Sequence, residues 1–314
     1  TIPILENMKI GVIGAGNWGK NLVKNFANLG VLHAVADSVK ENLNWVAENF
    51  PEIQRYETSD ELIASANLDA VAIATPPHTH CAIAIAAMEK GLDVFVEKPL
   101  TLDPEEARLL KDTATDRDRI LMVGHLLLYQ PAIQFIKKYL DNGELGKVFT
   151  LTQRRSKLGR VRSFENVLWS FGVHDVAVLL HLVGEAPADV QFSGHAAFTD
   201  KVEDDTHLHL KFPSGIIANL HNSWYWPRVE RELIITGEKG ILVFDELNAR
   251  VILHNKQVGK DLSHFDEGEE VIFEGADQPL LIELKHFLDC CEKRVKPISD
   301  GKNGFDVVNV LSQA

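Results

Sequence analysis

A glycine-rich turn near the start of the chain restricts the possible folds more than any other feature. The apolar residues 9–14 run into Gly14-Ala-Gly16-Asn-Trp-Gly19, and a helix-like segment follows. Gly14 permits a tight turn, Gly16 lets the backbone approach a pyrophosphate, and Gly19 lets the helix pack closely on the strand. The amino end of such a helix presents free N–H groups to phosphates. The pattern predicts a strand–turn–helix unit that binds a dinucleotide. The alternative is a glycine turn in an unrelated α/β protein.

An acidic residue follows at the distance expected of such a unit. The second strand-like segment, residues 32–37, ends at Asp37, which lies 23 positions after Gly14. A carboxylate at this position hydrogen-bonds ribose hydroxyls. It would repel the 2′-phosphate of NADP, and Ser38 follows with no arginine beside it. We therefore expect NAD as the cofactor and consider NADP less favoured.

Strand-like and helix-like segments then alternate as far as residue 125. Residues 68–77, 92–99 and 120–125 are apolar, strand-like segments, and residues 78–91 and 103–116 between them are helix-like. This alternation predicts a parallel sheet, and ligands of such sheets bind beyond the carboxyl ends of the strands.

One strand ends in an unusual way, at Glu97-Lys98-Pro99. Pro99 restricts Lys98 to extended geometry, so the lysine is held at the strand end where cofactor and substrate would meet. A lysine beside a substrate hydroxyl stabilises the developing alkoxide. We expect Lys98 to be catalytic. The alternative is a surface lysine at a strand end.

The second half of the chain offers a candidate base and a cluster of cations. Residues 171–184 have the pattern of an apolar helix with His174 near its amino end, and the pKa of histidine suits proton transfer near neutrality. The alternative for His174 is a structural role. Upstream, the basic run of residues 153–162 either captures an anionic substrate group or forms a solvated loop. It contains Arg154, Arg155, Lys157, Arg160 and Arg162.

Two histidines on one predicted strand have the spacing of metal ligands. Residues 205–212 alternate, so His207 and His209 share a face. A His-x-His pair can bind zinc, but no third ligand is evident nearby. We therefore expect no metal site, and interpret this face as packing against another subunit or solvent.

Composition narrows the class of protein. The 314 residues are 45% hydrophobic, enough for about two domains. We expect no membrane span, and the net charge of −13 argues against nucleic-acid binding. The three cysteines do not suggest a disulfide framework, and the first 14 residues lack the features of a signal peptide. We expect a cytoplasmic protein.

Three segments together resemble the Gfo/Idh/MocA oxidoreductases: GVIGAGNWG, ATPPHTHCAIAIAAMEKGLDVFVEKPL and the later GVHD. The resemblance implies an α/β fold with an N-terminal Rossmann domain, residues 1–125. It implies a C-terminal α/β domain, residues 126–314, with a large open, mostly antiparallel sheet. We expect the final helix to pack back on the first domain, and the open sheet to form a homodimer or homotetramer. Lys98 matches the family's active-site lysine, and His80 matches a histidine on the nicotinamide side. The expected cofactor-binding residues are Gly14, Gly16, Asn17, Trp18, Asp37, Ser38, Thr75, Pro76, His78, His80, Glu97, Lys98 and His125.

A finer resemblance is to the dehydrogenases that oxidise the 3-hydroxyl of UDP-N-acetyl sugars in surface-polysaccharide pathways. That subgroup usually has W-D-L-A-P-H-D where this chain has W-S-F-G-V-H-D at 169–175. Ser170 thus replaces a carboxylate, whose role would fall to Asp175 or to water. Tyr129 either lines the substrate pocket or packs in the core. The expected substrate-binding residues are Lys98, Tyr129, Arg154, Arg155, Arg160, Ser170, His174 and Asp175.

These features predict an NAD-dependent dehydrogenase with Lys98 and His174 as catalytic residues. The expected substrate is a UDP-N-acetylhexosamine or its uronic acid, oxidised at C3. One alternative is a dehydrogenase of a free sugar or inositol. The other is an NAD-binding sensor with impaired catalysis, which the serine at position 170 favours.

Overall fold

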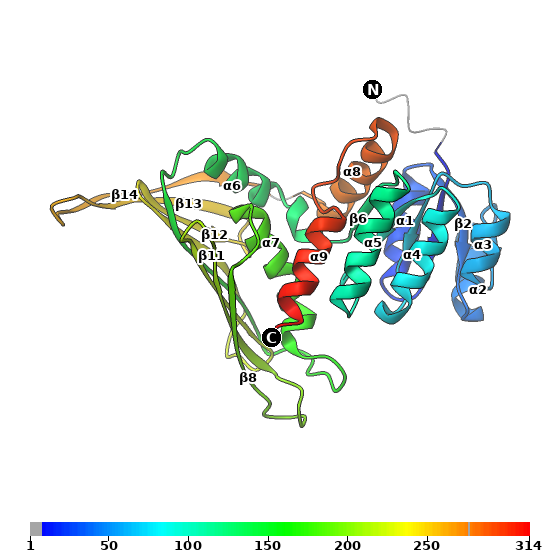
Figure 1. The fold of residues 1–314 in the computed structure, drawn as a ribbon, viewed down its shortest axis with the longest axis horizontal. Helices are drawn as coiled ribbons and strands as arrows, with labels where there is room; N and C mark the ends of the chain where they lie inside the picture. Colours follow the sequence, from blue (N-terminus) through cyan, green and yellow to red (C-terminus); the bar gives the residue numbers. More distant parts are fainter. Residues whose placement is uncertain (1–7, 276) are drawn as a thin grey trace. The chain divides into compact units, whose positions relative to one another are not determined.

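The chain folds into two compact units (Figure 1), in a computed structural model that describes residues 8–275 and 277–314. The first unit contains the residues up to His125 together with Leu280–Val308, and the second contains Leu126–Pro279 with Asn309–Ala314. The prediction that the chain has no signal peptide rests partly on residues 1–7, which lie outside the described residues.

The first unit is built on a six-stranded parallel sheet with the order β3-β2-β1-β4-β5-β6. The central strands are buried and almost wholly apolar, as is typical of sheets covered on both faces. The strand order reverses between β1 and β4, and a ligand crevice forms beyond the strand ends at such a point. The strands are β1 Ile10–Ile13, β2 Leu32–Ala36, β3 Gln54–Tyr56, β4 Ala70–Ile73, β5 Asp93–Val96 and β6 Leu121–Val123.

Local sequence signals explain where several helices of this unit begin. Thr58 and Glu61 form a capping box at the start of α3. Asp103 caps α5 by accepting a hydrogen bond from the Glu105 N–H at 2.6 Å, and Pro104 occupies its first position, as the sequence predicts. The helices are α1 Gly19–Asn28, α2 Lys40–Asn49, α3 Ser59–Ser65, η2 Pro77–Thr79, α4 His80–Glu89, α5 Pro104–Asp116, α8 Pro279–Lys293 and α9 Gly301–Leu311.

Residues 280–308 belong to the first unit by their contacts. The sequence analysis placed them in the second domain and expected only the final helix to pack on the first. The Val123 N–H donates to the Ser299 carbonyl at 2.7 Å, and the Ser299 hydroxyl donates to the Val123 carbonyl at 2.6 Å. Arg294 forms an ion pair with the buried Asp93. The amphipathic pattern of α8 predicts a helix, but it does not specify which apolar surface the helix covers.

The second unit is built on an eight-stranded sheet with the order β14-β13-β12-β11-β7-β10-β9-β8. Of its neighbouring strands, β7 and β10 are parallel and the other described pairs are antiparallel, which confirms the mostly antiparallel sheet. The strands are β7 Val148–Ser156, β8 Asp189–His195, β9 Asp205–Lys211, β10 Ile217–Ser223, β11 Glu230–Gly237, β12 Gly240–Asp245, β13 Arg250–Val258 and β14 His264–Glu274.

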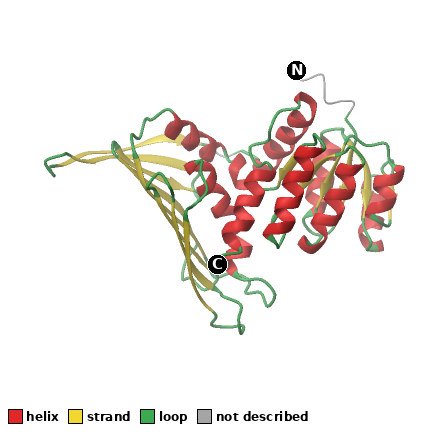
Figure 2. Cartoon of the chain, viewed as in Figure 1, coloured by secondary structure: helices red, strands yellow, loops and turns green. Residues whose placement is uncertain are grey.

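Four helical segments complete the second unit: η3 Leu126–Tyr129, α6 Pro131–Asp141, η4 Leu168–Gly172 and α7 Val173–Val183. The helix α6 packs on β13 and β14, and α7 packs on β7 and β10. Both lie on the same side of the sheet (Figure 2). Successive side chains of a strand point to opposite faces of the sheet. The other face therefore carries every second residue of each strand, among them the exposed Thr152, Arg154 and His207. Across the described residues, no helix combines the length and apolar character needed to cross a membrane.

Candidate cofactor and substrate sites

The glycine turn of the first unit has the geometry that its sequence predicts. Gly14 has a φ of +95°, and a Cβ there would lie 2.7 Å from the Ala74 carbonyl oxygen. A Cβ on Gly19 would lie 1.9 Å from the Gly14 oxygen, so only glycine fits at both positions. A Cβ on Gly16 would meet nothing within 4 Å. Gly16 therefore faces the open space that a phosphate group requires.

A cavity of about 530 Å³ lies at this turn, at the carboxyl ends of β1, β2 and β4. Its size is typical of a ligand site. Glu57, Thr58 and Ser59 also line it, and the sequence analysis did not name them. They follow β3, whose position beside β2 is set by strand order and cannot be read from a motif. The expected cofactor residues that line the cavity are Gly14, Gly16, Asp37, Ser38, Thr75 and Pro76.

Asp37 is held in place by hydrogen bonds from three neighbours. Its Oδ2 accepts from the Ala15 N–H at 2.6 Å and from the Asn42 amide at 3.1 Å, and its Oδ1 accepts from the Val39 N–H at 2.7 Å. An ionised carboxylate has about four acceptor positions, so it retains capacity for a ribose hydroxyl. Contact between Asp37 and the ribose of a cofactor stays a prediction that these hydrogen bonds permit.

The end of β5 places several titratable groups around Lys98. The Trp18 indole N–H donates to the Glu97 carboxylate, and burial raises the pKa of Glu97 to about 7, against the opposing effects of this bond and of the Lys98 charge. Burial lowers the pKa of His125 to about 4, and the Lys98 charge lowers it further. The His125 Nδ1 lies 2.6 Å from the Asn303 Oδ1. The charge of Lys98 is thus felt by a neutral imidazole and by a carboxyl group that titrates near neutrality.

His80 connects two turns, and the expectation that it contacts the cofactor needs correction. Its side chain is wholly buried. The Nε2 atom lies 2.9 Å from the Thr75 carbonyl oxygen, and the Nδ1 atom lies 3.0 Å from that of Pro99. Both ring nitrogens thus face the protein backbone. His80 fixes the turn after β4 relative to the Lys98–Pro99 segment, so its effect on a cofactor would be indirect.

The remaining cofactor residues of the sequence analysis stay predictions. Asn17, Trp18 and His78 are exposed.

Outside the cofactor set, α8 contributes Glu283, a carboxyl group that sequence reasoning did not single out. Its side chain is 1% exposed, and burial raises its pKa well above the usual value, with a further contribution from the charge of Glu97.

We expect Glu283→Gln to stabilise the protein at alkaline pH and to have little effect at acidic pH. A raised pKa in the folded state means that stability is fully present below the unfolded pKa near 4.5 and is lost as pH rises toward the folded pKa. The amide has no such penalty. Each 1 kcal/mol gained in the free energy of unfolding would raise Tm by about 2–4 °C. Thermal unfolding at about pH 5 and pH 8.5 measures this, with Glu292→Gln on the same helix as the control. An equal shift at both pH values would contradict a titrating Glu283.

In the second unit, a π-helical turn leads into the helix that carries His174. The turn is η4, and α7 begins directly after it. A Cβ on Gly172 would lie 2.5 Å from both the Asn222 Oδ1 and the Leu168 Cδ1, so a larger residue would separate the turn from β10. Turns of this kind occur frequently at functional sites. Here it brings Ser170 and His174 to the wall of one cavity.

This second cavity has a volume of about 410 Å³ and is rich in cations. Ser170, His174 and Arg155, three of the expected substrate residues, line it, and their contact with a substrate stays a prediction. The sequence analysis did not name Arg231, which also lines the cavity. Arg231 lies on β11 directly across from Arg155 on β7, and only the strand register reveals this pairing. Among the described lining residues, four cations accompany the single carboxylate of Glu246. The cations are Arg155, Lys157, Arg162 and Arg231.

The structure corrects the role expected of Arg154. Neighbouring side chains of a strand point to opposite faces, so Arg154 and Arg155 separate. Arg154 lies on the face away from α7, bonded to Glu230 at 3.0 Å with its guanidinium over the Trp226 ring. It therefore does not belong to the His174 cavity.

Asp175 is a buried anchor, which also corrects its expected contact with substrate. Its side chain is 0% exposed and accepts hydrogen bonds from Arg155 Nε at 2.9 Å and from Asn222 at 2.9 Å. Burial raises its pKa, and Arg155 opposes this. Arg155 also binds Glu246 at 2.6 Å. Because Asp175 has no surface in the cavity, it cannot supply the carboxylate that Ser170 replaces.

Two further expected substrate residues lie outside the lining of this cavity. Tyr129 is 2% exposed, as a packing residue would be. Arg160 is exposed, and its contact with substrate stays a prediction.

Over almost its whole length the chain is similar to known dehydrogenases. The chain is 31% identical over 310 residues to UDP-N-acetylglucosamine 3-dehydrogenase of Acidithiobacillus ferrooxidans, covering 98% of this chain and 96% of that protein. A solved structure of that enzyme superposes with a TM-score of 0.87 at 30% identity, over 98% of this chain and 96% of the other. The myo-inositol 2-dehydrogenase of Thermotoga maritima is 25% identical over 317 residues, 95% of this chain and 92% of that protein.

Two family models cover most of the chain. Residues 8–125 match the oxidoreductase family with an NAD-binding Rossmann fold, and residues 133–243 match the C-terminal domain of the same family. Together with the full-length relatives and the glycine turn described above, these matches show that the chain belongs to the Gfo/Idh/MocA family of oxidoreductases.

Proposed function

We propose that this protein is an NAD-dependent dehydrogenase that oxidises the C3 hydroxyl of a UDP-N-acetylhexosamine or its uronic acid. The observation that carries the proposal is the cluster of cations around the cavity beside His174. Lys157 and Arg162 line it from the basic run, and Arg231 lines it from β11. A diphosphate is the substrate group that such a cluster binds best. The similarity to a UDP-N-acetylglucosamine 3-dehydrogenase supports the same substrate class.

Each residue has a distinct task in the proposed reaction. His174, partly exposed at the amino end of α7, takes the proton of the sugar hydroxyl. The Lys98 ammonium stabilises the oxygen as negative charge develops. The Gly16 turn and Asp37 hold the pyrophosphate and the ribose of the cofactor. Bound NAD supplies the hydride acceptor.

A second candidate is a dehydrogenase of an inositol or a free sugar, which the similarity to a myo-inositol 2-dehydrogenase favours. A neutral polyol has no anionic group for Lys157, Arg162 and Arg231 to bind. The cation cluster therefore favours the sugar nucleotide.

Substrate-dependent growth of NADH absorbance tests the proposal. The panel contains UDP-N-acetylglucosamine, its uronic acid, N-acetylglucosamine and myo-inositol. In a second arm a 2-keto acid reoxidises tightly held NADH, and the oxidised sugar is measured by mass spectrometry in place of NADH absorbance. We expect turnover with a UDP-sugar and little with the two neutral compounds. Turnover with myo-inositol alone would establish the second candidate.

We expect the pair of substitutions Lys157→Met and Arg162→Met to raise KM for the UDP-sugar by about 10²–10⁴-fold and to change kcat little. Each lost hydrogen bond between charged groups costs about 1.5–3 kcal/mol of binding. Steady-state kinetics measures the change. Arg154→Gln is the matched control, since it comes from the same basic run but lies on the other sheet face. An unchanged KM in the double variant would rule out diphosphate binding at this cavity.

We expect Asp37→Ala to weaken NAD binding by about 10–100-fold and NADP binding much less. The substitution removes a hydrogen bond to the ribose, worth about 1.5–3 kcal/mol, and at the same time removes the repulsion of a 2′-phosphate. Titration of tryptophan fluorescence with each cofactor gives both dissociation constants. Equal losses for the two cofactors would show that Asp37 does not select NAD.

The protein is also proposed to form a homodimer or homotetramer through the sheet face that α6 and α7 leave uncovered. Light scattering on the purified protein measures the mass. A monomer at micromolar concentration would contradict this assembly.

A further inference from the structure

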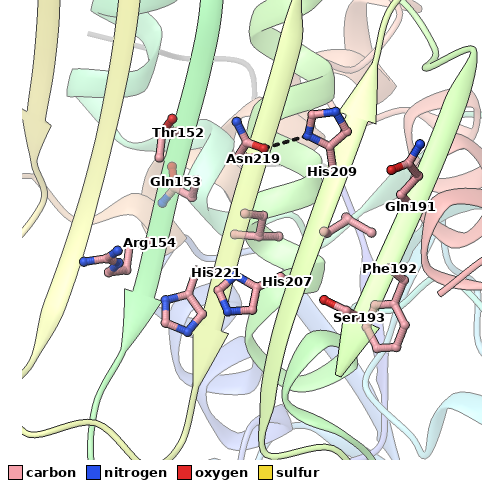
Figure 3. Close-up of a pocket in the computed structure, with 12 residues that line it drawn as sticks. Thr152, Gln153, Arg154, Gln191, Phe192, Ser193, His207, His209, Asn219 and His221 are labelled. Carbon is pink, nitrogen blue, oxygen red and sulfur yellow. Dashed lines mark hydrogen bonds between the residues drawn. The ribbon is translucent and has the colours of Figure 1, made fainter. Parts of the chain in front are cut away.

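Three side chains converge on the sheet face opposite α6 and α7. Asp205 and His207 lie two residues apart on β9, so both point to the same face. His221 lies on β10 directly across from His207. Figure 3 shows the two imidazole rings side by side on neighbouring strands. One ligand atom from each of the three residues lies within 4.8 Å of the others.

The two distances from the Asp205 carboxylate to the histidines match those between ligands of one small cation. The Asp205 Oδ1 lies 3.2 Å from the His221 Nε2 and 3.5 Å from the His207 Nε2. A tetrahedral zinc ion with bonds of about 2.1 Å separates its ligand atoms by about 3.4 Å. The two rings are stacked nearly parallel, with centroids 4.2 Å apart, so one imidazole must rotate before both Nε2 lone pairs can meet one ion. The exposed His207 side chain is the one that can rotate.

The surroundings favour the imidazole form that binds metals. The His221 side chain is 10% exposed, and burial lowers its pKa, while Asp205 raises it and the facing His207 and Arg154 lower it. A neutral imidazole is the metal-binding form. The charge of Arg154 is offset by Glu230, 3.0 Å from its guanidinium.

We propose that Asp205, His207 and His221 form a binding site for one divalent cation of the zinc class. Two imidazoles and a carboxylate are a common zinc ligand set, and they leave a fourth position open. That position faces a cavity of about 370 Å³, lined by polar residues that include Ser193 and Thr152. The site lies on the sheet face away from the His174 cavity, which is also the face proposed above to contact another copy of the chain, and it does not depend on the proposed dehydrogenase function.

The third ligand explains why sequence reasoning did not find this site. The sequence pairs His207 with His209, but the structure turns His209 to Asn219, with its Nδ1 2.7 Å from the amide oxygen. The partners of His207 are instead Asp205, two residues before it, and His221 on the next strand. Only the register of β9 with β10 brings these three together.

Titration of metal-free protein without an added histidine tag tests the site. We expect one Co²⁺ per chain with the visible absorption of a tetrahedral site, displaced by one equivalent of Zn²⁺. Binding should weaken at acidic pH, because protonated imidazole does not bind metal. His207→Ala and Asp205→Asn should each reduce Zn²⁺ affinity at least about tenfold.

His209→Ala is the matched control, since it removes a histidine from the same strand and face without touching the cluster. It should retain the affinity of the unaltered protein. The His207 side chain is 63% exposed, so its removal should leave the fold intact, as circular dichroism checks. Binding only at millimolar metal, equal affinity in His207→Ala, or an equal loss in His209→Ala would each overturn the proposal.

Discussion

Lys98→Met should lower kcat by about 10²–10³-fold while the protein still folds and binds NAD. That range is the usual effect of removing one group that stabilises developing negative charge. The methionine keeps most of the length of the side chain and loses the ammonium group with its charge and its hydrogen-bond donors. Steady-state turnover of the UDP-sugar measures the effect, and fluorescence titration measures cofactor binding. Lys90→Met, at an exposed position of the same unit, is the control and should keep full activity.

The same variant separates an enzyme from an NAD-binding sensor. Ser170 is the reason to consider a sensor, because this serine replaces the carboxylate that the family usually has there. It is 6% exposed and lines the cation-rich cavity. If activity persisted unchanged in Lys98→Met, the lysine would not be catalytic. If the unaltered protein bound NAD tightly but oxidised no sugar, the sensor would be favoured.

Asp175→Ala should destabilise the second unit by about 3–5 kcal/mol and abolish activity. Removing one partner of a buried ion pair leaves the other charge uncompensated, and Arg155 would keep only Glu246. The loss is a large part of the total stability of an ordinary domain. Because Asp175 also ties α7 to β7 and β10, we expect the adjacent His174 to lose its position. Urea unfolding and turnover measure the two effects.

An exposed ion pair of the same sheet is the matched control for Asp175. Asp189 pairs with Lys211 at 3.4 Å, with both side chains about half exposed. Asp189→Ala should lower the free energy of unfolding by less than about 1 kcal/mol. If the two variants lost similar stability, the buried network around Asp175 would not be the anchor that its contacts indicate.

The nucleotide-binding half could be predicted in detail because its determinants are local. The tight turn at Gly14 and the close packing at Gly19 depend on residues within one strand–turn–helix segment. The end of the following strand supplies Asp37, at a spacing that the same segment fixes. Such features leave a direct pattern in the sequence.

The substrate half could be predicted less well, because it depends on strand register. The basic run indicated an anion site, but alternation along β7 sends Arg154 to one face and Arg155 to the other. Arg231 joins the cavity only through the pairing of β11 with β7. The burial of Asp175 and the convergence of His207 and His221 are likewise results of tertiary structure.

Transfer of an isotope from the substrate to the cofactor tests the central claim most directly. A single turnover with UDP-N-acetylglucosamine carrying deuterium at C3 should give NADH labelled at nicotinamide C4, as mass spectrometry would detect. The account predicts deuterated NADH and a 3-keto sugar nucleotide. Unlabelled NADH formed from this substrate would show that the hydride leaves another carbon, and would contradict oxidation at C3.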